Sequence, residues 1–138
     1  MPSVVQALCD SGPLIALFDK SDGSHWRCRR ALAEFSGFFI TSWPVLTEAF
    51  HFLDQPRGRA QLWDFVGTDA VRVEEVSKGD LGRMQGLMEQ YADLPMDFAD
   101  ASLVVLAERL RVVKIFTLDR RGFTVFRPRH GEAFEIFP

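Results

Sequence analysis

Cysteine is scarce in this sequence, and long apolar runs are missing from it. Two cysteines, Cys9 and Cys28, stand among 138 residues, too few for the disulfide framework of a small secreted fold. No apolar run approaches the roughly 20 residues of a membrane-spanning helix, and the first residues, MPSVVQALCD, lack the pattern of a secretory signal. We therefore expect a cytoplasmic protein with reduced thiols and no membrane partner.

An excess of positive charge is also missing. Sixteen Lys and Arg residues face 19 Asp and Glu residues, which gives a net charge of −3 and at first argues against a nucleic-acid partner. If five of the acids are metal ligands, 14 remain against the 16 basic residues and the balance becomes +2. The overall charge therefore does not exclude nucleic acid.

The length of the chain fits one domain over residues 1–138, because 138 residues can bury about two thirds of the surface that the unfolded chain exposes. Apolar segments of strand length alternate along it with segments of helical periodicity. The predicted strands cover residues 4–9, 38–41, 71–76, 112–118 and 133–137, and the predicted helices cover 14–18, 24–35, 43–53, 57–66, 77–91 and 96–110. This alternation predicts a three-layer α/β fold, with a mainly parallel central sheet of about five strands flanked by helices and the last strand at an edge.

Aromatic residues are expected mainly in the core or at a dimer contact, including Trp26, Trp43 and Trp63. Cys9 is expected to be a buried strand residue, because no histidine is paired with it to make it a nucleophile.

Five acidic residues fall where predicted strands end or predicted helices begin. Asp10 and Asp119 follow the first and fourth strands, Glu48 lies about one turn into a helix, and Asp97 and Asp100 are three residues apart at a helix start. Ligands of parallel sheets bind at the carboxyl ends of the strands, so these side chains could converge on one pocket. Two carboxylates about 5 Å apart repel by roughly 3 kcal/mol at an effective dielectric near 20, and a divalent cation would remove that penalty.

Four of the five acids also have a simpler interpretation. Asp97 could complement the dipole of its helix, Glu48 could be a surface residue, and Asp10 and Asp119 could each begin a loop. The five together favour a metal site. Because the histidines and cysteines show no ligand spacing, an oxygen-only site suits Mg²⁺ or Mn²⁺ and points to phosphoryl chemistry.

Four segments carry a family resemblance, each weak alone and specific in combination: Cys9–Ala16, Thr47–Glu48, Leu94–Ala101 and Thr117–Phe123. They resemble the PIN domain, and most closely the VapC-type toxins of bacterial toxin–antitoxin pairs. The resemblance implies an acidic quartet that binds the metal, an extra acid, and two hydroxyls that border the site. The quartet is Asp10, Glu48, Asp100 and Asp119, and the extra acid is Asp97. The two hydroxyls belong to Ser11 and Thr117. Many relatives carry a further Asp where this chain has Gly122, so the number of metal ions stays open.

The resemblance further implies a metal-dependent endoribonuclease that hydrolyses RNA phosphodiester bonds. It implies a homodimer and inhibition by a cognate antitoxin, whose tail would lie in an apolar groove near residues 14–18 and 24–35 and place an Arg or Lys among the carboxylates. Arg120, Arg121, Arg127 and Arg129 could follow the RNA backbone. The alternative for these arginines is a solvated basic loop.

Two other functions compete with this hypothesis. A receiver-like phosphoacceptor module is also a small α/β domain with acids at strand ends, but here Asp10 stands alone after the first strand and the 71–76 strand leads to Ser77 and Lys78. A PIN fold that serves only as a binding scaffold is the second competitor. The complete acidic quartet argues against it.

Overall fold

The computed structural model describes residues 5–131 and 133–138, and over these residues five parallel strands form one sheet in the order β3-β2-β1-β4-β5. The strands are β1 (Val5–Cys9), β2 (Gly37–Ser42), β3 (Val71–Glu74), β4 (Lys114–Phe116) and β5 (Glu135–Phe137). Every pairing between neighbours is parallel. The predicted α/β fold is confirmed, with β5 at an edge as expected. Val4, predicted to begin the first strand, lies outside the described residues.

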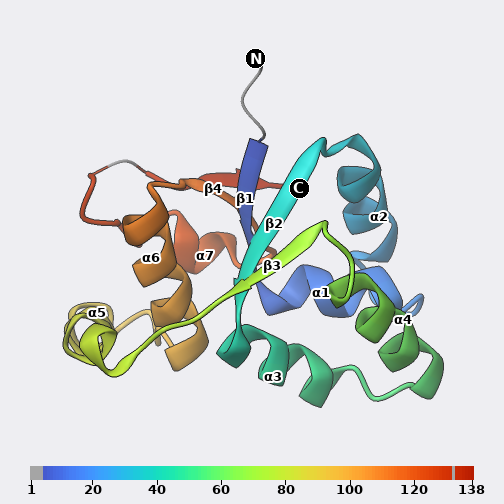
Figure 1. The fold of residues 1–138 in the computed structure, drawn as a ribbon, viewed down its shortest axis with the longest axis horizontal. Helices are drawn as coiled ribbons and strands as arrows, with labels where there is room; N and C mark the ends of the chain where they lie inside the picture. Colours follow the sequence, from blue (N-terminus) through green and yellow to red (C-terminus); the bar gives the residue numbers. More distant parts are fainter. Residues whose placement is uncertain (1–4, 132) are drawn as a thin grey trace.

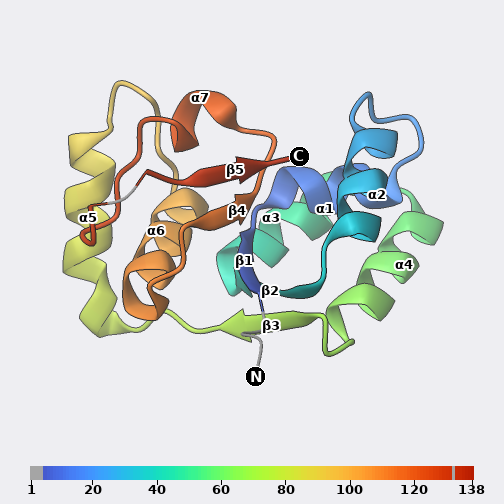
Figure 2. The ribbon, with the colours of Figure 1, turned by 90° about the horizontal axis from the view of Figure 1, so that it is seen from above.

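Helices cover both faces of the sheet, which gives the three predicted layers (Figures 1 and 2). On one side lie α1 (Ser11–Phe18), α2 (His25–Glu34) and α4 (Pro56–Val66), and on the other lie α5 (Leu81–Gln90), α6 (Phe98–Leu110) and the short α7 (Arg120–Phe123). The remaining helix, α3 (Trp43–Phe52), contacts both α1 and α6. A 3₁₀ turn (Lys78–Asp80) leads into α5. None of the helices in the described ranges has the length and apolar character needed to cross a bilayer.

The strand order creates a crevice between β1 and β4. From β1 the chain moves outward to β2 and β3, and it then returns to the other side of β1 to form β4 and β5. In open parallel sheets, ligands bind where the strand order reverses in this way, beyond the carboxyl ends of the strands. The receiver-like hypothesis does not fit, because that fold has the order 2-1-3-4-5.

The core beneath this crevice consists of buried strands and a buried helix. A row of stacked rings crosses the sheet, with centroids 5.4 Å apart for Phe39 and Phe116 and 5.0 Å apart for Phe116 and Phe137. On the other face, α6 buries eight of its residues against the sheet and α5. Cys9 is buried, as predicted, and burial raises the pKa of its thiol well above the ordinary value.

Several predicted boundaries are wrong, and three aromatic residues expected in the core or at a dimer contact lie outside the core. The helix predicted from Met96 begins at Phe98, because Asp97 caps it through its own side chain. The strand predicted over 112–118 is limited to β4. Trp26, Trp43 and Trp63 are 72%, 56% and 67% exposed, since each lies on the outer face of its helix. A role for these three in dimer contacts stays a prediction.

Candidate active site

Asp10 lies at the floor of the crevice and is held in place from three directions. It follows β1, and its backbone N–H donates to the Phe116 carbonyl of neighbouring β4 at 3.0 Å. Its Oδ1 caps α1 by accepting a bond from the Ser11 N–H at 2.8 Å. Its Oδ2 accepts a bond from the Thr117 hydroxyl at 2.7 Å. The carboxylate is therefore buried and oriented before any ligand arrives.

Thr117 joins Asp10 to Asp119. While its Oγ1 donates to Asp10, the same oxygen accepts a bond from the Asp119 N–H at 3.0 Å. Asp119 then caps α7, because its Oδ1 accepts a bond from the Gly122 N–H at 2.9 Å. The predicted convergence of the acids after β1 and β4 is thus observed, with a hydroxyl between them.

Glu48 reaches the same crevice from α3. The Ser42 hydroxyl caps this helix by accepting a bond from the Val45 N–H at 3.4 Å, and Glu48 follows about one and a half turns later. The Ser11 hydroxyl donates a short hydrogen bond to Glu48 Oε1. Ser11 therefore contacts two of the acids, through its backbone N–H to Asp10 and through its side chain to Glu48.

Asp97 and Asp100 form a capping box at the start of α6. Asp97 Oδ1 accepts a bond from the Asp100 N–H at 2.8 Å, and Asp100 Oδ2 accepts one from the Asp97 N–H at 3.2 Å. This geometry satisfies two of the free N–H groups of the first turn. Asp97 therefore does serve the start of its helix, as the simpler interpretation holds. Both carboxylates of the box also line the crevice.

All five acids line one cavity of about 510 Å³, which we call the acidic cavity. The residues around it are Asp10, Ser11, Gly12, Glu48, Leu94, Pro95, Asp97, Asp100, Leu118, Asp119, Arg121 and Gly122. Arg121 is the one basic residue in this set. A cavity with five carboxylates and a single guanidinium has a strong negative potential.

Burial and the neighbouring carboxylates raise the pKa values of two acids in this cavity. Burial raises the pKa of Asp10 from 3.8 to about 6; bonds from Thr117 and Ser11 lower it, and the charges of Glu48 and Asp119 raise it further. Burial also raises the pKa of Asp100 to about 8, with Asp10 as the next cause and Asp97 after it. A bound cation would favour the charged forms of both groups.

The carboxylate oxygens of the acidic cavity are chemically suited to a hard cation. Their side chains are nevertheless not arranged around an ion. Every acidic donor is a carboxylate oxygen, as Mg²⁺ and Mn²⁺ prefer. Within the described ranges, however, no three Asp, Glu, His or Cys side chains are grouped closely enough to hold an ion. The reason is visible in the local bonds, since Asp97, Asp100 and Asp119 each accept a backbone N–H of a helix cap. Ligation would require these side chains to turn away from their caps.

Two features of the site were not predicted. A buried hydrogen bond of 2.7 Å between the Ser42 and Ser102 hydroxyls links the helix that carries Glu48 to the helix that carries Asp100. At Gly122, a Cβ would lie only 2.6 Å from Asp119 Oδ2. A polar residue at position 102, within the apolar face of the predicted helix, was the available sequence signal for the first. The second depends on packing that the sequence does not reveal.

The predicted RNA-contacting arginines separate into different places. Arg121 lines the acidic cavity, whereas the Arg120 guanidinium donates to the Pro138 carbonyl oxygen at 2.5 Å. Arg127 donates to the Thr124 and Phe126 carbonyls, and Arg129 lines a different cavity beside α5 and α6. Arg120 and Arg121 belong to α7 and the chain turns away after it, so the four arginines do not line one cavity, and their contact with RNA stays a prediction.

Comparisons with known sequences give a relative that covers nearly the whole chain. No family model matches the chain. Ribonuclease VapC26 of Mycobacterium tuberculosis (strain ATCC 25618 / H37Rv) is 27% identical over an alignment of 142 residues, which covers 95% of this chain and 99% of the relative.

Two solved structures are similar in fold. M. tuberculosis VapC20, described as a Sarcin-Ricin loop cleaving toxin, matches with a TM-score of 0.71 and 19% identity over 79% of this chain and 86% of its own. A chain of VapBC2 from Rickettsia felis, bound to a DNA fragment from their promoter, matches with a TM-score of 0.62 and 13% identity over 97% of this chain and 100% of its own. In sequence over nearly its whole length and in fold, the chain is similar to VapC proteins, which confirms the predicted resemblance to PIN-domain proteins of the VapC type.

Proposed function

We propose that this chain is a VapC-like endoribonuclease that hydrolyses phosphodiester bonds of RNA. The observation that carries the proposal is the acidic cavity, in which five carboxylates from four separate segments line the crevice between β1 and β4. The similarity to a protein named a ribonuclease, over 95% of this chain, supports it.

We further propose that Mg²⁺ or Mn²⁺ is the cofactor, held by Asp10, Asp100, Asp119 and Glu48. When bound, such an ion would lower the pKa of a water molecule and balance negative charge on the phosphate that is attacked. The raised pKa values of Asp10 and Asp100 support this proposal, since burial and then the neighbouring carboxylates disfavour their charged forms and a bound cation would favour them. Gly122 adds no carboxylate, so the donors are limited to the five acids.

The remaining chemistry falls to the residues of the chain. Thr117 and Ser11 keep Asp10 and Glu48 oriented through their hydroxyls. Asp97 is exposed at the rim of the cavity, where it or Glu48 would orient the attacking water. Arg121, the basic residue among the lining residues, would bind a phosphate oxygen of the substrate.

A cognate antitoxin is the proposed inhibitor, and a homodimer is the proposed assembly. The VapC likeness supports the antitoxin, since one structural neighbour is described as a toxin and another belongs to VapBC2. A basic antitoxin side chain would find partners among the carboxylates of the acidic cavity. A cytoplasmic location stays a prediction, in keeping with two buried cysteines that form no disulfide.

The test is cleavage of a total RNA pool during a Mn²⁺ titration, with wild type compared with Asp10→Asn and Asp119→Asn. We expect either substitution to abolish cleavage and to leave the fold intact. In Asp119→Asn, the new amide oxygen can still accept the Gly122 N–H bond that the carboxylate accepts in the wild type. Asp93→Asn is the matched control, because Asp93 is exposed and does not line the acidic cavity.

Fragmentation by either folded variant at the wild-type rate would overturn the proposal. Failure of the folded wild type to cut any RNA would instead favour the non-catalytic scaffold.

A further inference from the structure

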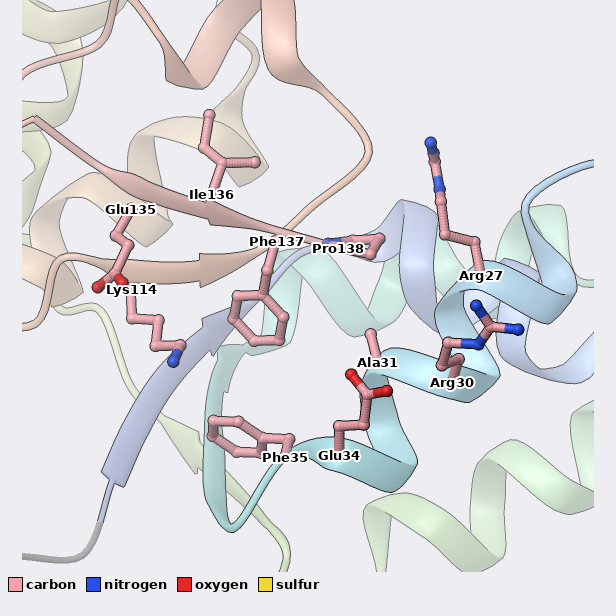
Figure 3. Close-up of a pocket in the computed structure, with 10 residues that line it drawn as sticks. All are labelled: Arg27, Arg30, Ala31, Glu34, Phe35, Lys114, Glu135, Ile136, Phe137 and Pro138. Atoms are coloured by element: carbon pink, nitrogen blue, oxygen red, sulfur yellow. The ribbon is translucent and has the colours of Figure 1, made fainter.

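A second cavity lies between α2 and β5, on the side of the sheet that carries α1 and α4. It measures about 490 Å³, within the range of small-ligand sites, and we call it the β5 cavity. Its lining includes Arg27, Arg30, Phe35, Lys114, Phe137 and Pro138. In Figure 3, Phe137 points from β5 toward Phe35 and the end of α2, whereas Ile136 points to the opposite side of the strand.

The floor of the β5 cavity is aromatic. Phe35 and Phe137 stack with centroids 5.6 Å apart and an interplanar angle of 22°. The Lys114 Nζ lies 5.3 Å from the centroid of Phe137 and 5.9 Å from that of Phe35. Both rings are only partly buried. Aromatic surface beside a cation is the combination with which proteins bind single-stranded nucleic acid.

The wall formed by α2 carries two arginine side chains. Arg27 and Arg30 are exposed on this helix, and among the described residues neither forms an ion pair. With Lys114 they give the lining three cations against two acids, Glu34 and Glu135. The β5 cavity is therefore net positive, in contrast to the acidic cavity.

Three consecutive residues, Asp119 to Arg121, lead from the acidic cavity to a residue that lines the β5 cavity. Asp119 and Arg121 line the acidic cavity, and Arg120 between them donates to the carbonyl oxygen of Pro138, which lines the β5 cavity. A strand that leaves the acidic cavity past Arg121 would therefore pass Arg120 before it reaches the arginines of α2.

We propose that the β5 cavity binds a nucleotide of the RNA strand that is cut in the acidic cavity, with its base against the Phe35–Phe137 pair and its phosphates at Arg27 and Arg30. This inference rests on the proposed ribonuclease function and extends it to substrate binding outside the cleavage site. An acidic protein segment would match the arginines as well. RNA is favoured because one strand explains both the aromatic floor and the link through Arg120 to the acidic cavity.

The test measures the salt dependence of binding to a labelled single-stranded RNA in EDTA, with the integrity of the RNA checked afterwards. Each phosphate contact contributes about 0.7 to the slope of log affinity against log salt. We therefore expect Arg27→Gln/Arg30→Gln to reduce the slope by about 1.4. The control Arg29→Gln/Arg57→Gln removes the same charge from exposed helix positions outside the cavity, and it should keep the wild-type slope. Phe137→Leu should weaken binding by roughly tenfold with little change in slope, since it removes stacking area and no charge.

The outcomes separate this inference from the proposed function. RNA cleavage by wild type together with equal slopes for the two double variants would overturn the inference and leave the ribonuclease proposal standing. A wild-type protein that neither binds nor cuts RNA would overturn both. If Arg27→Gln/Arg30→Gln leaves the RNA slope unchanged and instead releases a purified protein partner, the cavity is a protein-binding site and the inference fails.

Discussion

Gly122 lies where the wall of the acidic cavity has no space for a side chain. A Cβ there would be 2.6 Å from Asp119 Oδ2 and 2.8 Å from Cε2 of Phe126. Neither neighbour can move freely, because Asp119 caps α7 and Phe126 is fully buried. The further Asp that the family resemblance leads us to expect at this position is therefore incompatible with Asp119 as it stands.

Replacing Gly122 with Ala should disrupt cleavage through Asp119. Overpacking of this kind costs about 1–3 kcal/mol, and it would push the side chain of Asp119, a proposed metal ligand, away from its cap on α7. We expect at least a tenfold loss of RNA cleavage, on the order of the effect of misplacing one reacting group, together with a lower midpoint in urea. Gly86→Ala is the control, since a Cβ at that position of α5 meets nothing within 4 Å. It should stabilise the helix by up to about 1 kcal/mol and keep activity. Wild-type cleavage by Gly122→Ala would contradict this account of Asp119.

The elements that carry the acids are aligned by buried hydroxyls. Ser102 Oγ donates to the Ala99 carbonyl at 2.6 Å, so its bond of 2.7 Å with Ser42 Oγ uses the proton of Ser42. Ser42 also caps α3. The start of α3, which carries Glu48, is thus attached to the first turns of α6, which carry Asp100.

The two hydroxyls of this pair should contribute to stability together. Removing both should lower the free energy of unfolding by less than the sum of the losses from removing each one alone. Ser102→Ala leaves the buried Ser42 hydroxyl without its acceptor, a loss of about 1–3 kcal/mol. Ser42→Ala removes the same bond and a helix cap worth about 1 kcal/mol. In urea unfolding, we expect the double variant to lose less stability than the sum of the two single variants, by about 1 kcal/mol. The single variants should also cleave RNA more slowly, and simple additivity would refute the coupling between α3 and α6.

The elements themselves were largely predictable, because alternating apolar segments determine which parts of this chain can form a buried parallel sheet. Asp10 and Asp119 could be placed together for the same reason, since both follow strands. The faces and ends of elements were less predictable. Trp26 is out of phase with the buried His25 and Cys28 of its helix, yet its size alone suggests burial. The four residues of α7 are too few to show a period, and the Ser42–Ser102 contact spans 60 residues.

At the scale of the whole molecule, the acidic cavity lowers stability as the pH rises. The pKa values of Asp10 and Asp100 are raised by burial to about 6 and about 8, above the ordinary value of 3.8. Between pH 4 and 8 the unfolded chain therefore loses these protons before the folded chain does, and the free energy of unfolding falls. Below pH 4 both states are protonated, and the difference disappears. The same competition makes metal binding weaker at lower pH.

Asp100→Asn should remove a large part of this pH dependence. Each pKa unit corresponds to about 1.4 kcal/mol, and after allowance for partial exposure we expect the variant to be more stable than wild type at pH 8 by on the order of 2 kcal/mol, or roughly 4–10 °C in Tm. At pH 4 the two proteins should melt alike, because neither carries the charge. The Asn amide oxygen can keep the bond that Asp100 accepts from the Asp97 N–H, so the cap of α6 is preserved.

Asp64→Asn, at an exposed site on α4, controls for the change in net charge. Mn²⁺ at pH 8 should raise the Tm of wild type toward that of Asp100→Asn and raise the Tm of the variant much less. A wild-type Tm that stays level with the variant from pH 4 to 8 would contradict the destabilising role of this carboxylate.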